Sequence, residues 1–320
     1  MMVYDIFNGD ADGIFSVIQF QKKYPQKTKL ITGIKRDIEL LKDLEPNSDD
    51  YLRIFDISMK KNMPYLSGLL KRNIDIIYFD HHDPGNIPLK NNLESYISTS
   101  PNACTSLLVS AYLKKEFHIW AIPGIFGDNL SDVALEESKK LKLGYKEIQK
   151  LKILGELVNY NSYGETIGDL TVHPKLLLEE IIEYDSPLNV IDNKSSLINE
   201  IQEVFTSDYQ QAKKSETLYT DENVSVIKMK NHISSNRISG YYSNHIANEN
   251  PYKAHAIITT NKEKNIKVSI RAPLNKNKGA VAVAKKFPTG GGRERAAGIN
   301  NLPIEMLDEF IKEFSSFYRK

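Results

Sequence analysis

The sequence lacks several features that would assign it to common classes of protein. Cys104 is the only cysteine, so no disulfide can form within the chain, and a reducing, cytoplasmic environment is expected. No apolar run approaches the ~18 residues that a membrane-spanning helix needs. The first residues contain no charged segment of the kind that begins a cleavable signal. We therefore expect a cytoplasmic globular protein that does not enter a membrane.

A strong net charge is also missing, since the formal value is only +1. The small value hides an asymmetry. Residues 220–320 contain 17 Lys and Arg against 9 Asp and Glu, a net of +8, and the remaining residues contain 25 against 32, a net of −7. A basic region beside an acidic one suits an anionic substrate held by one domain and metal ions held by the other. A lysine-rich solvated surface would give the same count.

The length of 320 residues is enough for two domains. We place an N-terminal domain over residues 1–190 and a C-terminal domain over 220–320, joined by a helical linker over 191–219. In the N-terminal part, short apolar strands alternate with expected helices over residues 14–23, 38–44, 64–71 and 131–154. This alternation predicts an α/β fold with a doubly wound parallel sheet.

The C-terminal part has a different pattern. We expect strands over residues 224–227, 256–260 and 266–271, with a hairpin turn over 261–265. We expect helices over residues 198–217, 237–248, 281–286 and 304–318. The prediction is a smaller α/β domain.

Acidic residues follow short apolar runs at four places in the N-terminal part. The runs cover residues 3–7, 52–55, 74–79 and 122–127. The side chains after them are Asp10, Asp12, Asp56, Asp80 and Asp128, and Asp80 is followed directly by His81 and His82. Ligands bind at the carboxyl ends of the strands in such sheets. One acid after a strand is usually a helix cap, but four such places beside a histidine pair predict a shared site.

The side chains of this site indicate its ligands. Carboxylates with at least one imidazole suit Mn²⁺ or Mg²⁺ better than a zinc ion in a thiolate cage. Because several carboxylates close together repel one another, two ions are favoured over one. Two cations roughly 3.5–4 Å apart clamp the attacking and leaving oxygens of a phosphate ester. The chemistry predicted is hydrolysis by a metal-held hydroxide.

A glycine-rich stretch near the end of the chain predicts a second binding element. Gly290, Gly291 and Gly292 offer three bare amides to a phosphate. Arg293 and Arg295 add charge and donors, and Arg271 at a strand end could join them. A glycine triplet alone is usually a flexible turn. With the arginines beside it, phosphate binding is the favoured interpretation.

Taken in order, these motifs resemble the DHH phosphoesterase family. Residues 290–299 resemble the glycine-rich signature of the DHHA1 domain that often follows it. The family includes RecJ-type exonucleases, nanoRNases, pAp phosphatases, cyclic-dinucleotide phosphodiesterases and manganese pyrophosphatases, and most characterised members use Mn²⁺. The resemblance covers nearly the whole chain and implies a DHH domain followed by a DHHA1-like domain.

The resemblance also implies roles for individual residues. It implies one metal on Asp10 and Asp56, and a second on Asp12, Asp56, His81 and Asp128, with Asp56 bridging. His82 would face the substrate phosphate and Asp80 would orient a histidine, which makes Asp80, His81 and His82 the catalytic set. Asn8 stands where relatives supply an acid or a histidine as the first ligand, so the first metal would be held more weakly. Arg293 stands where DHHA1 domains commonly have a histidine.

The expected function is hydrolysis of phosphate esters in small nucleotides, with Mn²⁺ as the metal and Mg²⁺ as an alternative. Short oligonucleotides are the preferred substrate, followed by a cyclic dinucleotide or a 3′,5′-bisphosphate. The departures at Asn8 and Arg293 motivate an alternative, a non-catalytic nucleotide-binding or regulatory protein. A RecJ-like exonuclease on long single strands is less favoured, and an editing activity is more remote. A homodimer, the metal's identity and the role of residues 159–164 stay open.

Overall fold

The computed structural model describes residues 1–260 and 265–319. It divides into two compact units, Met1–Glu203 and Val204–Lys320, which we call unit 1 and unit 2. The division falls within helix α9 (Ser196–Ala212). None of the described helices has the length and apolar character needed to cross a bilayer. Each unit has its own sheet, so each is described separately.

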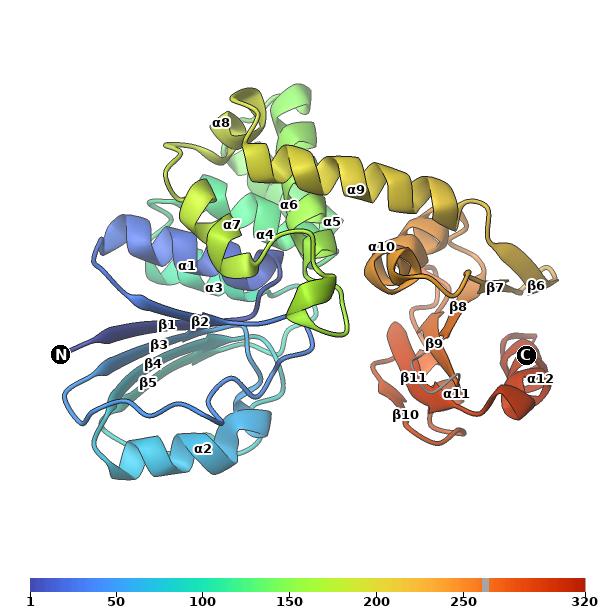
Figure 1. Ribbon diagram of the computed structural model, residues 1–320, viewed down its shortest axis with the longest axis horizontal. Coiled ribbons are helices and arrows are strands. Elements are labelled where there is room, and N and C mark those ends of the chain that lie inside the picture. The colour runs from blue at the N-terminus through green and yellow to red at the C-terminus, as the bar shows by residue number, and fades with distance from the viewer. Residues whose placement is uncertain (261–264, 320) are drawn as a thin grey trace. The chain divides into compact units, whose positions relative to one another are not determined.

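Unit 1 is built on a sheet in which the five described strands are all parallel (Figure 1). The strands are β1 (Val3–Phe7), β2 (Lys29–Thr32), β3 (Tyr51–Phe55), β4 (Asp75–Asp80) and β5 (Leu93–Ile97), in the order β2-β1-β3-β4-β5. Helix α2 (Met59–Lys71) covers one face, and α1 (Ala11–Lys23), α3 (Thr105–Tyr112) and α4 (Ala121–Gly127) cover the other. The expected doubly wound fold is confirmed. The strand order reverses at β1, where such sheets bind ligands.

The sequence explains why the chain turns sharply after β1. The apolar strand ends at Phe7, and Asp10 caps α1 by accepting a hydrogen bond from the Gly13 N–H at 3.1 Å. Gly13 lies so close to Asn8 that a Cβ there would come within 2.1 Å of the Asn8 carbonyl oxygen. The turn therefore holds Asp10 and Asp12 at the carboxyl end of β1.

Several expected elements of unit 1 were wrong in type or length. Residues 38–44 are not helical, and only 40–43 form a turn. The Asn62 side chain bonds this backbone instead: it donates to the Ile38 carbonyl at 2.5 Å and accepts from the Leu41 N–H at 3.2 Å. The expected helix over 131–154 is divided into α5 (Ser131–Lys140) and α6 (Tyr145–Asn161). Lys142, at φ +57°, lies in the left-handed region between them. Residues 122–127 belong to helix α4, so Asp128 follows a helix and not a strand.

Three more α-helices follow α6: α7 (Pro174–Ile181), α8 (Pro187–Asp192) and α9, whose first part belongs to unit 1. Helix α9 ends at Ala212 and not at 217, because strand β6 begins at Glu216.

Unit 2 contains a mixed sheet with six described strands in the order β10-β11-β9-β8-β7-β6. They are β6 (Glu216–Thr220), β7 (Val224–Lys228), β8 (Ala254–Thr260), β9 (Ile266–Arg271), β10 (Gly290–Gly292) and β11 (Ala296–Leu302), with helices α10 (Ile233–Glu249), α11 (Ala280–Ala284) and α12 (Leu307–Tyr318). Alternate residues of β9 pack into a core that includes Phe310 and Phe314 of α12. Except for Asn265, the expected turn over 261–265 lies outside the described residues.

Candidate metal centre

Five of the predicted side chains of unit 1 meet at the carboxyl edge of its sheet, close to the ends of β1, β3 and β4. Two groups have ligand atoms that all lie within 4.8 Å of one another, and they share His81. One group contains Asp12, His81 and Asp128, and the other contains Asp56, His81 and His82. Segments far apart in sequence therefore converge as predicted, although Asp128 reaches the group from the end of helix α4.

Asp12 is held by the start of helix α3. One carboxylate oxygen accepts from the Thr105 N–H at 2.6 Å. The other accepts from the Ser106 N–H at 2.7 Å and the Ser106 hydroxyl at 2.5 Å. The carboxylate thus satisfies amides at the positive end of a helix dipole and cannot rotate freely. The sequence gave no sign of this contact.

Asp56 lies at the centre of the cluster in a strained backbone conformation. Its φ is +57°, in the left-handed region that few residues other than glycine adopt. One carboxylate oxygen accepts from the Thr105 hydroxyl at 3.0 Å and lies 3.4 Å from His81 Nε2. Burial raises the pKa of Asp56 well above its usual range, and the charges of Asp10 and Asp12 raise it further. A bound cation would relieve this electrostatic penalty.

His81 is oriented with one ring nitrogen toward the acids. Its Nδ1 lies 3.1 Å from the carbonyl oxygen of Ala103, so Nδ1–H donates and Nε2 faces Asp56 and, at 3.8 Å, Asp128. A backbone carbonyl that fixes one nitrogen in this way is common for metal-binding histidines. Burial would lower the pKa of His81, but Asp56 and Asp128 raise it to about 10. The site therefore favours a positive charge at this position.

Asp80 orients the second histidine. Its Oδ1 accepts from the backbone N–H groups of His81 at 2.8 Å and His82 at 3.2 Å, and it lies 2.7 Å from His82 Nδ1. The His82 ring therefore donates through Nδ1. Its side chain is 32% exposed, which leaves it accessible to a ligand. Asp80 itself is fully buried.

Asp10 has a different environment from the other acids. The Nζ of Lys35, a residue that the sequence did not suggest, lies 2.5 Å from its Oδ2. Burial would raise the pKa of Asp10, but the Lys35 ammonium and the Gly13 N–H bring it below its usual value. Asn8 uses its Oδ1 to accept from the Asp10 N–H at 3.3 Å. In the part of the chain that the structure describes, Asp10 belongs to neither group of closely spaced ligand atoms.

Lys35 follows strand β2, next to β1 in the sheet, and it contacts the segment 159–164. Its Nζ lies 3.1 Å from Asn159 Oδ1 and 5.6 Å from the centre of the Tyr163 ring, and its N–H donates to the Ser162 carbonyl at 3.0 Å. Burial would lower the pKa of Lys35, but Asp10, with Tyr163 and Asp128, raises it well above its ordinary value. Residues 159–164 therefore help to hold the Lys35 ammonium group beside Asp10.

The donor chemistry fits a divalent cation at one part of the cluster. Carboxylates of Asp12, Asp56 and Asp128, with the Nε2 of His81, are ligands that Mn²⁺ and Mg²⁺ accept. Burial also raises the pKa of Asp128, although His81 opposes that rise. Asn8 and Asp10 form a poorer set, since the amide is neutral and the carboxylate is already paired with a lysine.

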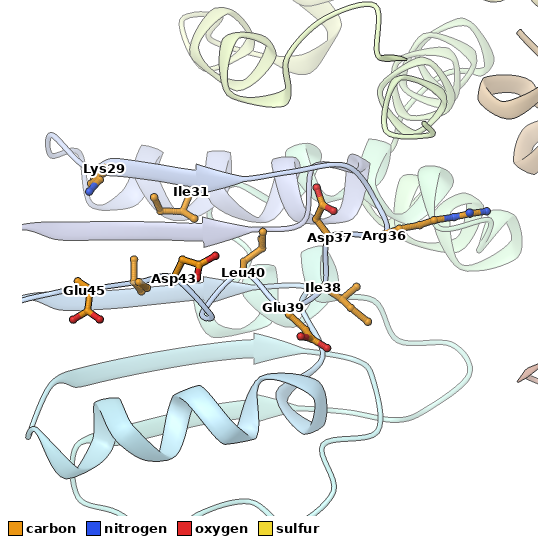
Figure 2. A pocket seen from close by; sticks show the side chains of 10 residues that line it. Lys29, Ile31, Arg36, Asp37, Ile38, Glu39, Leu40, Asp43 and Glu45 are labelled. Atoms are coloured by element: carbon orange, nitrogen blue, oxygen red, sulfur yellow. The ribbon is translucent and has the colours of Figure 1, made fainter. Parts of the chain in front are cut away.

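A groove of about 760 Å³ in unit 1 contains none of the predicted residues. It is lined by strand β2 and the segment that replaces the expected helix, as Figure 2 shows. Arg36, which also lines the groove, extends past the carboxyl ends of the strands (Figure 2). Acidic and basic side chains both line the groove, and they do not gather into one group of ligands. The groove is therefore a weaker candidate for a catalytic site than the acidic cluster.

In unit 2 the glycine triplet is a strand and not a loop of bare amides. Gly290–Gly292 form edge strand β10 paired with β11, and the Gly290 N–H donates to the Phe287 carbonyl at 3.1 Å. A Cβ on Gly290 would lie 1.8 Å from the Ala284 carbonyl oxygen, and Gly292 has φ +136°. Packing and backbone geometry thus require both glycines. A Cβ on Gly291 would meet no atom within 4 Å.

The three arginines that the sequence singled out in unit 2 lie at one end of its sheet. Arg271 ends β9 opposite Ala296, the first residue of β11. Arg293 and Arg295 belong to the turn between β10 and β11 and are exposed, whereas Arg271 Nε donates to Asn244 Oδ1 at 2.6 Å. The turn is closed by the Arg293 N–H, which donates to the Ala296 carbonyl at 2.8 Å. Positive charge is therefore gathered beside Gly291.

Comparison with known proteins supports the predicted resemblance. A family model described as DHHA1 domain matches residues 221–320. No curated protein sequence matches the chain. The structure resembles a DHH-domain protein described as a member of a family of ribosomal proteins, with a TM-score of 0.63 and 13% identity over 99% of this chain and 86% of that one.

Two further solved structures share the fold. RecJ from Thermus thermophilus, solved with Mn²⁺ and separately with Mg²⁺, gives a TM-score of 0.64 and 14% identity for the Mn²⁺ structure, over 99% of this chain and 52% of that one. PggH from Vibrio cholerae, a pGpG-specific phosphodiesterase, gives a TM-score of 0.57 and 12% identity, over 100% of this chain and 99% of that one. At these identities the likeness shows that the chain shares the fold of these structures, and the family model places a DHHA1 domain at residues 221–320, as the sequence implied.

Proposed function

We propose that this chain, with its DHH fold and DHHA1 domain, is a divalent-metal-dependent phosphoesterase that hydrolyses small nucleotides or short oligonucleotides. The observation that carries the proposal is the convergence of Asp12, Asp56, His81 and Asp128 at the carboxyl edge of the parallel sheet. Neighbours with the same fold include a RecJ solved with metal and a pGpG-specific phosphodiesterase. The acids are buried or partly buried, and burial raises the pKa of two of them, so the cluster is suited to a cation.

A divalent metal bound there would supply Lewis acidity toward a phosphate ester and lower the pKa of a bound water. Asp12, Asp56, His81 and Asp128 would hold it. His82, fixed through Nδ1 by Asp80, would present its other nitrogen to the phosphate and donate a proton to an oxygen there. Asp80 would keep the His82 ring in this orientation, because its buried carboxylate lies 2.7 Å from Nδ1.

We propose that unit 2 contributes phosphate-binding groups. Arg293 and Arg295 are exposed on the turn after the glycine strand, where guanidinium groups suit phosphate oxygens. Gly291 leaves open space beside them, which would let a phosphate approach the backbone. We also propose short nucleotides as the substrates, and Mn²⁺ as the metal with Mg²⁺ as its alternative.

A non-catalytic nucleotide-binding protein is the second candidate, favoured by one observation. Lys35 pairs with Asp10 where the family resemblance implies a metal. A protein that no longer needed two-metal chemistry could have such a pair and still bind nucleotides through unit 2.

Turnover distinguishes the two candidates. The test is release of phosphate or nucleotide with Mn²⁺ or Mg²⁺ from pAp, two- to five-nucleotide RNA and DNA, cyclic dinucleotides and long single strands. Asp56→Ala and Asp80→Ala should abolish turnover. Asp75→Ala is the matched control, because Asp75 is exposed at the opposite end of the same strand as Asp80. Nucleotide binding without turnover of any substrate would reject the enzyme and favour the binding protein.

A further inference from the structure

The side chain of Lys35 is enclosed by groups that suit an ammonium ion. Asp10 Oδ2 lies 2.5 Å from Nζ and Asn159 Oδ1 lies 3.1 Å from it. The ring of Tyr163 offers its π-face at 5.6 Å. An anion, a neutral acceptor and an aromatic ring therefore surround one charge. These groups come from the start of α1 and the end of α6, so the arrangement depends on the tertiary structure and not on a chance surface contact.

The backbone of Lys35 is also held in place. Its N–H donates to the Ser162 carbonyl at 3.0 Å, and its own carbonyl accepts from Asn8 Nδ2 at 3.4 Å. Asn8 thus bonds Lys35 with its amide nitrogen and Asp10 with its amide oxygen. The carboxylate of an aspartate at position 8 has no N–H groups and could not make the bond to Lys35. Asn8 therefore helps to hold both Lys35 and Asp10 in place.

Asp10 differs from Asp12 in that one of its partners carries a positive charge. Its Oδ1 accepts from the Gly13 N–H at 3.1 Å, and its Oδ2 is paired with Lys35. A divalent ion on Oδ2 would sit roughly 2.1 Å from that oxygen, close to the ammonium group already bound there. The two cations would repel strongly at that separation. The pair Asn8 and Asp10 does not fit the first of the two metals that the family resemblance implies.

The other ligands differ from Asp10 in this respect. The partners that fix these ligands are neutral. Asp12 accepts from the N–H groups of Thr105 and Ser106. Asp56 accepts from the Thr105 hydroxyl, and His81 donates to the Ala103 carbonyl. Those groups fix the ligands without supplying a competing positive charge. This part of the cluster fits a divalent ion, whereas Asp10 is already neutralised.

We propose that the Lys35 ammonium occupies the position of the first cation, so that the centre holds one divalent ion, on Asp12, Asp56, His81 and Asp128, and not two. This inference rests on the proposed metal-dependent function. It gives Asp56 one metal to bind and removes its bridging role. It also makes Lys35 a positioning residue, since a fixed ammonium supplies positive charge at Asp10 whatever the metal concentration.

Metal stoichiometry tests the proposal without any need for a substrate. The metal-free protein is dialysed against a range of Mn²⁺ concentrations, and bound manganese is measured by elemental analysis. Electron paramagnetic resonance of the same samples separates isolated Mn²⁺ from coupled pairs. Wild type should bind one ion per chain with the spectrum of isolated Mn²⁺. The double variant Asn8→Asp with Lys35→Met should bind two ions, with a coupled-pair spectrum.

Two controls keep the result interpretable. Lys29→Met removes an exposed lysine from strand β2 and should still bind one ion. Asp12→Asn in the wild-type background should lose the ion, which locates it away from Asp10. Circular dichroism and thermal unfolding of each variant confirm that it is folded before its stoichiometry is counted.

The possible outcomes separate this inference from the proposed function. Two coupled ions in wild type would overturn the inference and leave a metal-dependent enzyme standing. One ion in both wild type and the folded double variant would overturn the role of Lys35. No ion in wild type would overturn the metal-dependent function, and the inference with it. One ion in wild type and two in the double variant would support both.

Discussion

Under the proposed function, the acidic cluster of unit 1 and the arginine turn of unit 2 are two different ways of preparing a protein for phosphate chemistry. In unit 1, Asp12, Asp56 and Asp80 are almost fully buried, and backbone or hydroxyl donors fix each carboxylate. In unit 2, Arg293 and Arg295 extend from an exposed turn. Groups that act on the reacting atoms must be held within fractions of an ångström. Groups that only bind the rest of a substrate can adapt to its length.

The two regions also differ in what they contribute to stability. The cluster in unit 1 is unfavourable without a cation, since burial and mutual repulsion raise the pKa values of Asp56 and Asp128. The sheet of unit 2 has an apolar core in which β9 packs against Phe310 and Phe314. We therefore expect metal removal to destabilise unit 1 and to leave unit 2 unaffected. Trp120, the only tryptophan, is buried in unit 1 and reports on that unit alone.

The largest expected effect is on turnover in Asp56→Asn. Loss of this central carboxylate should lower kcat by ~10³-fold or more, because it removes a metal ligand and not merely a surface charge. The same change removes a buried, repelled carboxylate. Above pH 10, where His81 no longer holds a proton, the metal-free variant should therefore unfold at a higher temperature than metal-free wild type, as measured by Trp120 fluorescence in a chelator. Lower stability of the metal-free variant would contradict the electrostatic account of the cluster.

The next largest effect is expected on how the stability of metal-free unit 1 depends on pH. The folded-state pKa of His81 is raised to about 10, so the native state retains a proton that the unfolded state releases near 6.5. This stabilisation is complete below pH 6.5 and is lost as pH rises to about 10, by on the order of 5 kcal/mol. In His81→Gln, the free energy of unfolding should fall less over this pH range. Urea unfolding at several pH values, followed by Trp120 fluorescence, measures it. A decline of equal size in His81→Gln would assign the titration to another group.

Much of the fold and part of the site could be predicted from sequence. Apolar runs with acids after them identified β1, β3 and β4, because buried parallel strands are short and continuous in apolar residues. The aspartates at their ends converge because the carboxyl ends of parallel strands share one edge of the sheet. Asp128 was included correctly in the group but with the wrong element before it, since periodicity does not separate a short buried helix from a strand.

Other features could not be predicted because they depend on contacts between distant segments. Lys35 follows β2 and meets Asn159 of α6, which no local pattern links to it. Thr105 and Ser106 lie in an ordinary helix start until α1 presents Asp12 to them. The glycine triplet suggested a phosphate loop, but pairing with β11 and contact with Ala284 decide its structure. Strand β5 was missed because its residues alternate between partly buried and exposed, without a long apolar run.

A smaller effect is expected on substrate affinity when the arginines of unit 2 are changed. Arg293→Ala and Arg295→Ala should each raise KM by ~10-fold with little change in kcat, because each would remove one charge-assisted contact. The loss should diminish at high salt, since exposed charges are screened. Lys312→Ala removes an exposed charge from helix α12 and is the matched control. A fall in kcat at constant KM would instead assign the arginines to the chemical step.

The smallest effect is expected for Gly291→Ala, which tests whether a ligand approaches the backbone at a position where packing does not require glycine. A Cβ at this position meets no atom within 4 Å, so the unfolding temperature should stay close to that of wild type. Gly290→Ala is the contrasting variant and should destabilise unit 2, because its Cβ would lie 1.8 Å from the Ala284 carbonyl oxygen. If a phosphate approaches the strand at Gly291, the methyl group should raise KM about 3-fold without changing stability. An unchanged KM would confine substrate binding to the arginine side chains, and the open space beside Gly291 would then have no part in recognition.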